Sequence, residues 1–149
     1  MNDWKQFSRY AKNEFSKGDY VAALKLHKKA LNTGTLNFST NFSLDVEGAI
    51  AAVLVSHFNI SDTYTALKQF EAACQQFETA FKFLHPLSDN KACNSEIELA
   101  LIRAYSHLNF EWTKFINQHG KDLNAERTRW YLNAQKTFEH TRKPSYQVH

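Results

Sequence analysis

The most informative pattern in this chain of 149 residues is a repeated series of apolar, small and polar positions. In residues 7–31 and 57–81, aromatic side chains and alanines recur at three- and four-residue steps, which place them on one face of a helix. Small residues allow two helix backbones to approach, and rings fill the gaps beside them. The pattern therefore predicts two helix–turn–helix units.

The apolar period predicts an all-α chain of about six helices. The first pair spans about residues 2–32, with Gly18 and Asp19 in its turn and Gly34 as its C-terminal cap. Residues 35–42 are expected to form a polar loop. This loop helps to explain why the second unit is displaced by 50 residues rather than the usual 34 or so.

The second pair is expected over about residues 43–84. Ser43 is placed to cap its first helix, and Pro86 is placed to end its second. Glycine and alanine dominate residues 48–52, which predicts that another helix packs closely there.

The third pair is expected over about residues 95–142. Ser95 and Glu98 form a capping box, and the apolar period then continues to Gly120, which ends the helix. A regular repeat would turn near Asn109. Because neither Gly nor Pro forces that turn, one long helix is favoured, with the turn as the alternative.

The last helix is capped by Asp122 or Asn124, and residues 143–149 are expected to form a loose tail. A second loop is expected over residues 87–94. Residues 1–149 together have the length of one ordinary domain.

Composition supports a globular protein, since 43% of the residues are apolar and 22% are charged. The net charge of +3 is unevenly distributed. Residues 1–34 carry seven Lys/Arg against three Asp/Glu, residues 35–120 carry five against nine, and residues 121–149 carry six against three. Basic ends that flank an acidic middle suggest contact between copies or a partner of mixed charge, although solvated helix faces also produce such a distribution.

The sequence contains no motif for metal, phosphate or nucleophilic chemistry. Cys74 and Cys93 form no CxxC, and none of the seven histidines stands in an HxxxH or HExxH arrangement. We therefore expect no enzyme activity and no cofactor. The acidic middle argues against nucleic acid. The longest uncharged stretch is too short to span a membrane, so a cytoplasmic protein is expected.

The repeated units resemble the tetratricopeptide repeat. The resemblance rests on two series of residues and covers about 60 residues well: Ala11, Tyr20, Ala23 and Ala30 in the first unit, and Tyr64, Leu67, Phe70, Ala73, Phe77 and Ala80 in the second. It departs from the pattern at Glu14, His27 and Ser61, and it is lost after Leu108. The chain also looks similar to small bacterial repeat proteins with no assigned function.

The resemblance implies a right-handed stack of antiparallel helix pairs, an α-solenoid whose first helices line a concave groove. Carried over by position, the groove would present Lys5, Ser8, Arg9, Lys12, Asn59, Asp62, Arg103 and His107. Some family members clamp a terminal carboxylate there. Lys12 and Asn59 match that clamp, but Ser8, Glu96 and Ala100 do not, so this particular activity is not expected.

A basic stripe remains, because Lys5, Arg9 and Lys12 follow an i, i+4, i+7 spacing on one helix face. Such a stripe suits an acidic segment of a protein or peptide, although a solvated helix face has the same composition. The sequence thus predicts a non-catalytic adaptor that binds a protein or peptide. The alternative is a self-associating subunit whose groove is filled by its own C-terminal helix or by a second copy.

Overall fold

The computed structural model of this chain describes residues 2–88 and 94–141, and within them it contains only helices and their connections. No strand occurs in these two ranges, which confirms the all-α class. The described elements are α1 (Asn2–Ser16), α2 (Tyr20–Leu36), α3 (Phe38–Leu44), α4 (Val46–Ala66), α5 (Phe70–Ser88), α6 (Ser95–His119), the short 3-10 helix η1 (Gly120–Asp122) and α7 (Ala125–Thr141).

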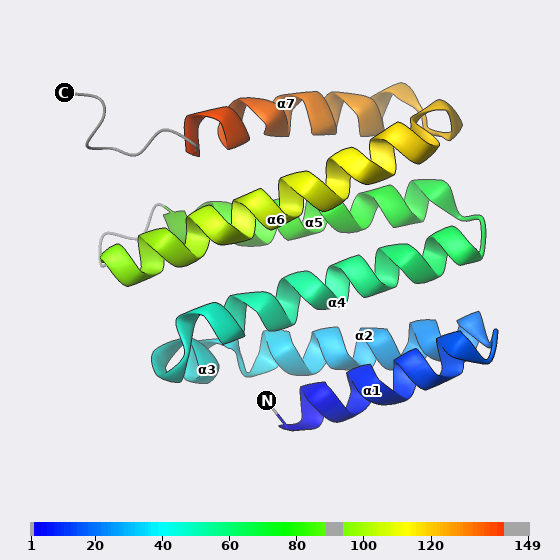
Figure 1. Cartoon of the computed structure of the whole chain (residues 1–149), viewed down its shortest axis with the longest axis horizontal. Coiled ribbons are helices and arrows are strands. Elements are labelled where there is room, and N and C mark those ends of the chain that lie inside the picture. The colour runs from blue at the N-terminus through cyan, green and yellow to red at the C-terminus, as the bar shows by residue number, and fades with distance from the viewer. Residues whose placement is uncertain (1, 89–93, 142–149) are drawn as a thin grey trace.

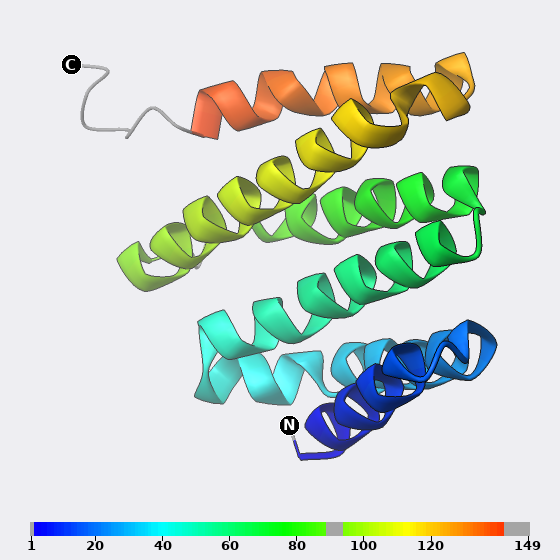
Figure 2. The same ribbon diagram turned by 45° about the vertical axis from the view of Figure 1, so that its right-hand side comes forward.

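The helices are stacked in chain order, from α1 and α2 at one end to α7 at the other (Figures 1 and 2). The most extensive contacts join α1 with α2 and α4 with α5, which are the first two pairs expected from the sequence. α6 and α7 form the third expected pair, although α6 contacts α5 more extensively than it contacts α7. Consecutive pairs are joined because α4 packs against both α2 and α6. In Figure 1, α1 lies in front of α2 and α6 lies in front of α5.

The turns of the first two pairs have the same backbone geometry, 50 residues apart. Gly18 and Lys68 both adopt positive φ, at 83° and 60°. The next residue donates its N–H five positions back in both turns, from Asp19 to Glu14 and from Gln69 to Tyr64. The repeated sequence pattern therefore corresponds to a repeated turn, although only the first turn has the glycine that such a φ favours.

The segment between the first two pairs is helical, so the polar loop expected over residues 35–42 is wrong. Gly34 does not end α2 but lies within it, buried where a Cβ would sit 3.6 Å from the Trp4 ring and 3.7 Å from the Ala52 methyl group. The short α3 then accounts for the seventh helix. Its rings Phe38 and Phe42 pack onto the core and give the segment an apolar reason to fold.

Three predicted helix ends also differ from the structure. Asp45, rather than Ser43, caps α4 by accepting the backbone N–H of Gly48 at 3.0 Å. α5 continues past Pro86 to Ser88, and Leu87 beside that proline packs onto the core. The remaining difference concerns α6, described next.

α6 is one uninterrupted helix of 25 residues, which agrees with the long-helix prediction and excludes a turn at Asn109. Its cap is Asn94, one residue before the expected capping box, and the Asn94 side chain accepts the N–H of Ile97 at 3.0 Å. The helix ends before Gly120, as expected. Asn124 caps α7 by accepting the N–H of Arg127 at 3.2 Å, which selects it over Asp122. The predicted tail at 143–149 and most of the second loop lie outside the described residues.

The main apolar core belongs to α4, α5, α6 and α7. Trp112 and Leu108 of α6 are fully buried in it, and rings from α5 and α7 surround the tryptophan. A buried ion pair also joins α5 to α7, with Glu78 3.0 Å from Arg127. Burial raises the pKa of Glu78 to about 7, although the guanidinium beside it opposes that shift.

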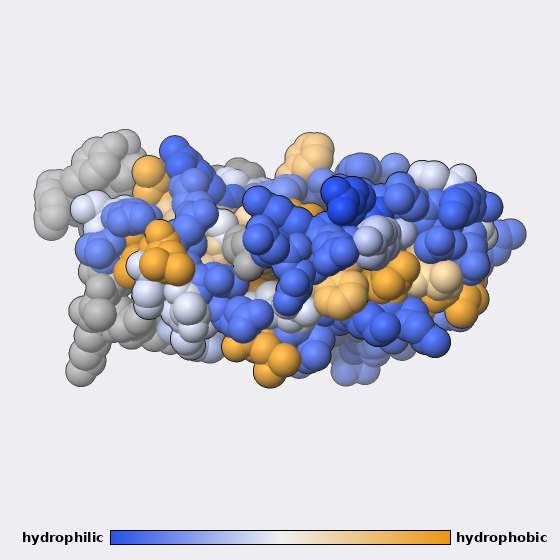
Figure 3. Space-filling view, turned by 90° about the horizontal axis from the view of Figure 1, so that it is seen from below, coloured by the Kyte–Doolittle hydropathy of each residue, from blue (hydrophilic) through white to orange (hydrophobic). Residues whose placement is uncertain are grey.

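The first pair is attached by different means. Ala11, Ala23 and Ala30 are fully buried and allow the α1 and α2 backbones to approach. One side-chain hydrogen bond ties α1 to α4, since the Trp4 indole donates to Ser56 at 2.7 Å. Seen from the α1/α2 end, the surface is mainly hydrophilic with separate apolar residues (Figure 3).

The repeated turn predicts opposite effects of two substitutions. Lys68→Gly relieves the steric cost of a left-handed backbone, and we expect it to raise the free energy of unfolding by about 0.5–1 kcal/mol. Gly18→Lys introduces that cost, and we expect a loss of about 1 kcal/mol. Urea unfolding of the two variants measures both effects. A loss with Lys68→Gly would contradict the positive φ at this turn.

The buried His27 of α2 predicts a pH dependence. Burial and, to a smaller extent, the cation of Lys12 together lower its pKa to about 4. Because the folded state binds the proton less well than the unfolded chain, the free energy of unfolding falls as the pH falls from about 6.5 towards 4, by up to about 3 kcal/mol. His27→Leu should remove this part of the slope in urea unfolding at several pH values. Above about pH 7.5 the free energies of unfolding of the wild type and of His27→Leu should change with pH in parallel. If the two change in parallel at all pH values, this role for His27 is excluded.

Candidate docking groove

Six of the eight residues predicted to line a groove are exposed on α1, α4 and α6, and two are not. On α1, the side chains of Lys5, Arg9 and Lys12 are exposed, so the basic stripe exists as a surface. Ser8 lies between them in sequence but is only 5% exposed, and it packs inward. Its predicted place in the groove is therefore wrong, because serine at this position contributes to helix packing.

α4 supplies the middle of this surface. Ser56 of α4 is bonded to α1, and Phe58 of α4 packs against a histidine ring of α6 with the ring centroids 4.8 Å apart. Around the axis of α4, Asn59 and Asp62 lie between these two residues. The two predicted residues thus lie between the neighbouring helices. Asp62 is exposed there. Asn59 is half-buried, and its Nδ2 atom is enclosed without a hydrogen-bond partner in the described residues.

α6 forms the other side of the surface. Arg103 is exposed and makes an ion pair with Glu47 at the beginning of α4. One turn later, His107 packs against the edge of the Phe58 ring, and its Nε2 atom lies 3.9 Å from the Glu111 carboxylate. The resemblance to the tetratricopeptide repeat placed Arg103 and His107 on this face, but it did not pair Arg103 with an acidic residue 56 positions away.

A cavity of about 140 Å³ opens between α4 and α6 beneath that ion pair. Its floor is apolar, since Ile50 and Leu54 are each only 2% exposed. Small side chains leave the space open. The complete lining is Glu47, Ile50, Ala51, Leu54, Ala100, Arg103, Ala104 and His107. We call this space the α4–α6 cavity.

The small residues that line this cavity were visible in the sequence, but the cavity itself was not predicted. The run of small residues at 48–52 predicted a close helix contact, and Ala52 makes one with Gly34 of α2. Ala51 of the same run faces the cavity. The alanines of α6 that complete it, Ala100 and Ala104, were visible only as members of a helical period. Sequence reasoning missed the cavity because it depends on which two helix faces meet.

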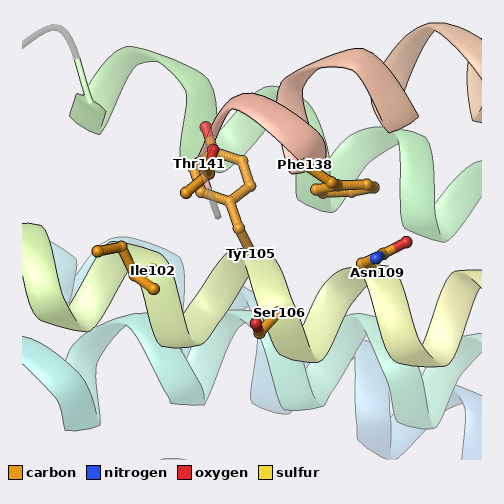
Figure 4. Close-up of a pocket in the computed structure, with 6 residues that line it drawn as sticks. All are labelled: Ile102, Tyr105, Ser106, Asn109, Phe138 and Thr141. Carbon is orange, nitrogen blue, oxygen red and sulfur yellow. The ribbon is translucent and has the colours of Figure 1, made fainter. Parts of the chain in front are cut away.

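Two smaller hollows are less suited to a ligand. One lies between α6 and α7, where the rings of Tyr105 and Phe138 stand 6.0 Å apart (Figure 4). Its volume is about 20 Å³, which is room for about one water molecule. The other, about 50 Å³, lies between α4 and α6 beside Asp62. Loss of solvent raises the pKa of Asp62, the nearby Glu111 raises it further, and Lys114 opposes both effects.

A broader hollow of about 590 Å³ runs along α6 itself. Phe110 lies on this hollow and is 65% exposed, although most of the lining is polar. Asn109 and Thr113 at its edge are bonded to Gln135 and Tyr131 of α7, which anchors that helix beside the hollow.

Burial determines the protonation state of Cys74 in the core. Burial raises the pKa of the Cys74 thiol to about 12, so it is protonated at neutral pH and is a poor nucleophile. In the two described ranges, no group of three or more His, Cys, Asp and Glu side chains is placed to share a metal ion. None of the helices described there is both long and apolar enough to cross a membrane.

Comparison with known proteins gives a family but no activity. Neither the curated proteins nor the solved structures contain a match to this chain. A family described as "protein of unknown function (DUF2753)" matches residues 2–145, which is nearly the whole sequence. The chain therefore belongs to the DUF2753 family.

Proposed function

We propose that this chain is a non-catalytic module that binds an acidic segment of a protein partner on the face formed by α1, α4 and α6. The observation that carries the proposal is the arrangement of exposed cations, with Lys5, Arg9 and Lys12 on one side and Arg103 on the other. Positive charges at both edges favour a chain that carries carboxylates.

The proposal includes the architecture, a right-handed solenoid of the tetratricopeptide type. The turns at Gly18 and Lys68 support it, because two segments 50 residues apart have the same φ sign and the same backbone hydrogen bonds. Repeated helix pairs of this kind commonly bind proteins through the helices that line one face. A bacterial cytoplasm is the proposed setting, in which cysteines such as Cys74 remain reduced.

The alternative function is self-association, and one observation favours it. Phe110 is exposed in the broad hollow of α6. In this alternative a second copy covers the hollow beside α7. α7 itself packs on α5 and α6, on the opposite side of α6 from α4 (Figure 1).

Charge reversal tests the adaptor function. We expect the variant Lys5→Glu/Arg9→Glu/Lys12→Glu to lose a protein that the wild-type chain captures from lysate of the source organism. The reason is repulsion between the new carboxylates and the acidic segment. Capture by the wild type should also weaken as salt is raised, because exposed charges are screened over about 10 Å at 0.1 M ionic strength.

The matched control reverses three exposed lysines on other helices, Lys25, Lys29 and Lys136. This variant should keep the partner. Both variants are first compared with the wild type by urea unfolding at pH 8, where His27 is neutral in the folded and the unfolded state. Equal capture by all three folded proteins would overturn the proposed face, and capture that is indifferent to salt would count against an acidic partner.

Molar mass in solution tests the alternative function. If copies associate through α6, light scattering should give a mass that rises with concentration, and Phe110→Ser should lower it by removing an exposed ring from the contact. Leu132→Ser removes an exposed apolar residue of α7 (57% exposed) and serves as the control, with no expected effect. A monomeric mass at all concentrations would exclude self-association.

A further inference from the structure

The α4–α6 cavity suggests what the acidic segment carries besides charge. We propose that the cavity takes one bulky aliphatic side chain of the partner, and that a carboxylate next to it in the partner replaces Glu47 on Arg103. This inference rests on the proposed function and specifies its ligand. The partner is thus a protein segment in which an apolar residue is flanked by acidic ones.

The size and lining of the cavity support the first half of the proposal. Its volume of about 140 Å³ is several times the roughly 30 Å³ share of one water molecule, and an apolar cavity of similar size, about 150 Å³, binds benzene. Ile50, Leu54, Ala100 and Ala104 form apolar walls that are each less than 9% exposed. Water gains few hydrogen bonds from such walls, whereas an aliphatic side chain gains contact with all of them.

The ion pair above the cavity supports the second half. The side chains of Arg103 and Glu47 are 62% and 52% exposed, so solvent screens their attraction and the pair contributes little to the fold. A carboxylate from outside can therefore replace Glu47 at little cost. Arg103 can hold such a carboxylate through two parallel N–H donors.

Exposed cations on the two sides of α4 favour an acidic partner. Arg103 stands at the rim, and the exposed cations of α1 lie across α4 from it. The negative groups on this face are Glu47, Asp62, Glu96 and Glu111, of which Glu47 already faces a cation and Glu111 lies near the ring of His107. An acidic segment that extends from α1 to α6 would contact the cations of α1 at one end and Arg103 at the other, and the cavity lies beside Arg103.

The test uses three capped heptapeptides as probes: leucine flanked by three glutamates on each side, alanine in place of that leucine, and lysines in place of all glutamates. They are titrated into the full-length chain at low salt, and the methyl resonances of Ile50, Leu54, Ala100 and Ala104 are followed by NMR. We expect the leucine–glutamate peptide to shift these methyl signals and to bind about tenfold more tightly than the alanine peptide. The lysine peptide should bind more weakly than both.

Three variants and one control make the assignment specific. Arg103→Gln should weaken the binding of the leucine–glutamate peptide, whereas Glu47→Gln should strengthen its binding by removing the competing carboxylate. Ala51→Leu places a side chain into the cavity from an exposed helix position and should abolish the preference for leucine over alanine. Ala125→Leu makes the same change at an exposed position of α7 and should leave that preference intact.

The outcomes separate this inference from the proposed function. If the leucine and alanine peptides bind equally and shift only resonances of α1, the cavity is not the site, while the acidic-segment adaptor stands. If no peptide shifts a resonance of α1, α4 or α6, the inference is overturned, and the capture experiment with the charge-reversed variants decides the adaptor function independently. If Glu47→Gln binds the leucine–glutamate peptide more weakly than the wild type, only the proposed replacement of Glu47 by a partner carboxylate is overturned.

Discussion

Helix backbones can approach closely only where both surfaces carry small side chains, and the packing of this chain depends on that constraint. Gly34 of α2 meets Ala52 of α4, and Ala73 and Ala80 of α5 are fully buried. Rings then fill the space on either side of these close contacts, as Trp112 does in α6. The same small residues also explain the α4–α6 cavity. There Ala51, Ala100 and Ala104 line a gap that no side chain fills, so the small residues leave a cavity at the surface.

Much of the helical framework could be predicted from the sequence, because amphipathic periodicity survives in any arrangement of the helices. The continuous α6 is the best example: its apolar residues keep the period through Asn109, and no Gly or Pro interrupts it. Helix ends were predicted less well. Asp45 and Asn94 are as capable of capping as Ser43 and Ser95, and the choice depends on where the tertiary contacts require each helix to begin.

Two wrong predictions share one cause: glycine and polar residues predicted helix ends without regard to the side chains that pack against them. Gly34 is typical of a helix end, yet here it lies buried inside α2, next to Trp4 and Ala52. Residues 35–42 are rich in polar side chains, yet Phe38 and Phe42 pack onto the core and keep α3 helical. Of the candidate site, sequence position predicted the exposed cations well. It could not show that Ser8 is buried or that Arg103 faces Glu47, because these facts depend on contacts between distant helices.

The division of the core has a consequence for the dynamics of the molecule. The large apolar cluster joins α4 to α7, with α3 packed on it, and includes no residue of α1 or α2. The first pair is held by alanine contacts and by the bond from Trp4 to Ser56. Small contacts of this kind bury less apolar surface than the rings around Trp112, so α1 and α2 are expected to open locally, and to exchange their amide hydrogens, before the core of α4, α5 and α6 does. The basic stripe of α1 therefore lies on a pair that is expected to open locally, and a partner bound there would lose part of its binding free energy in ordering that pair.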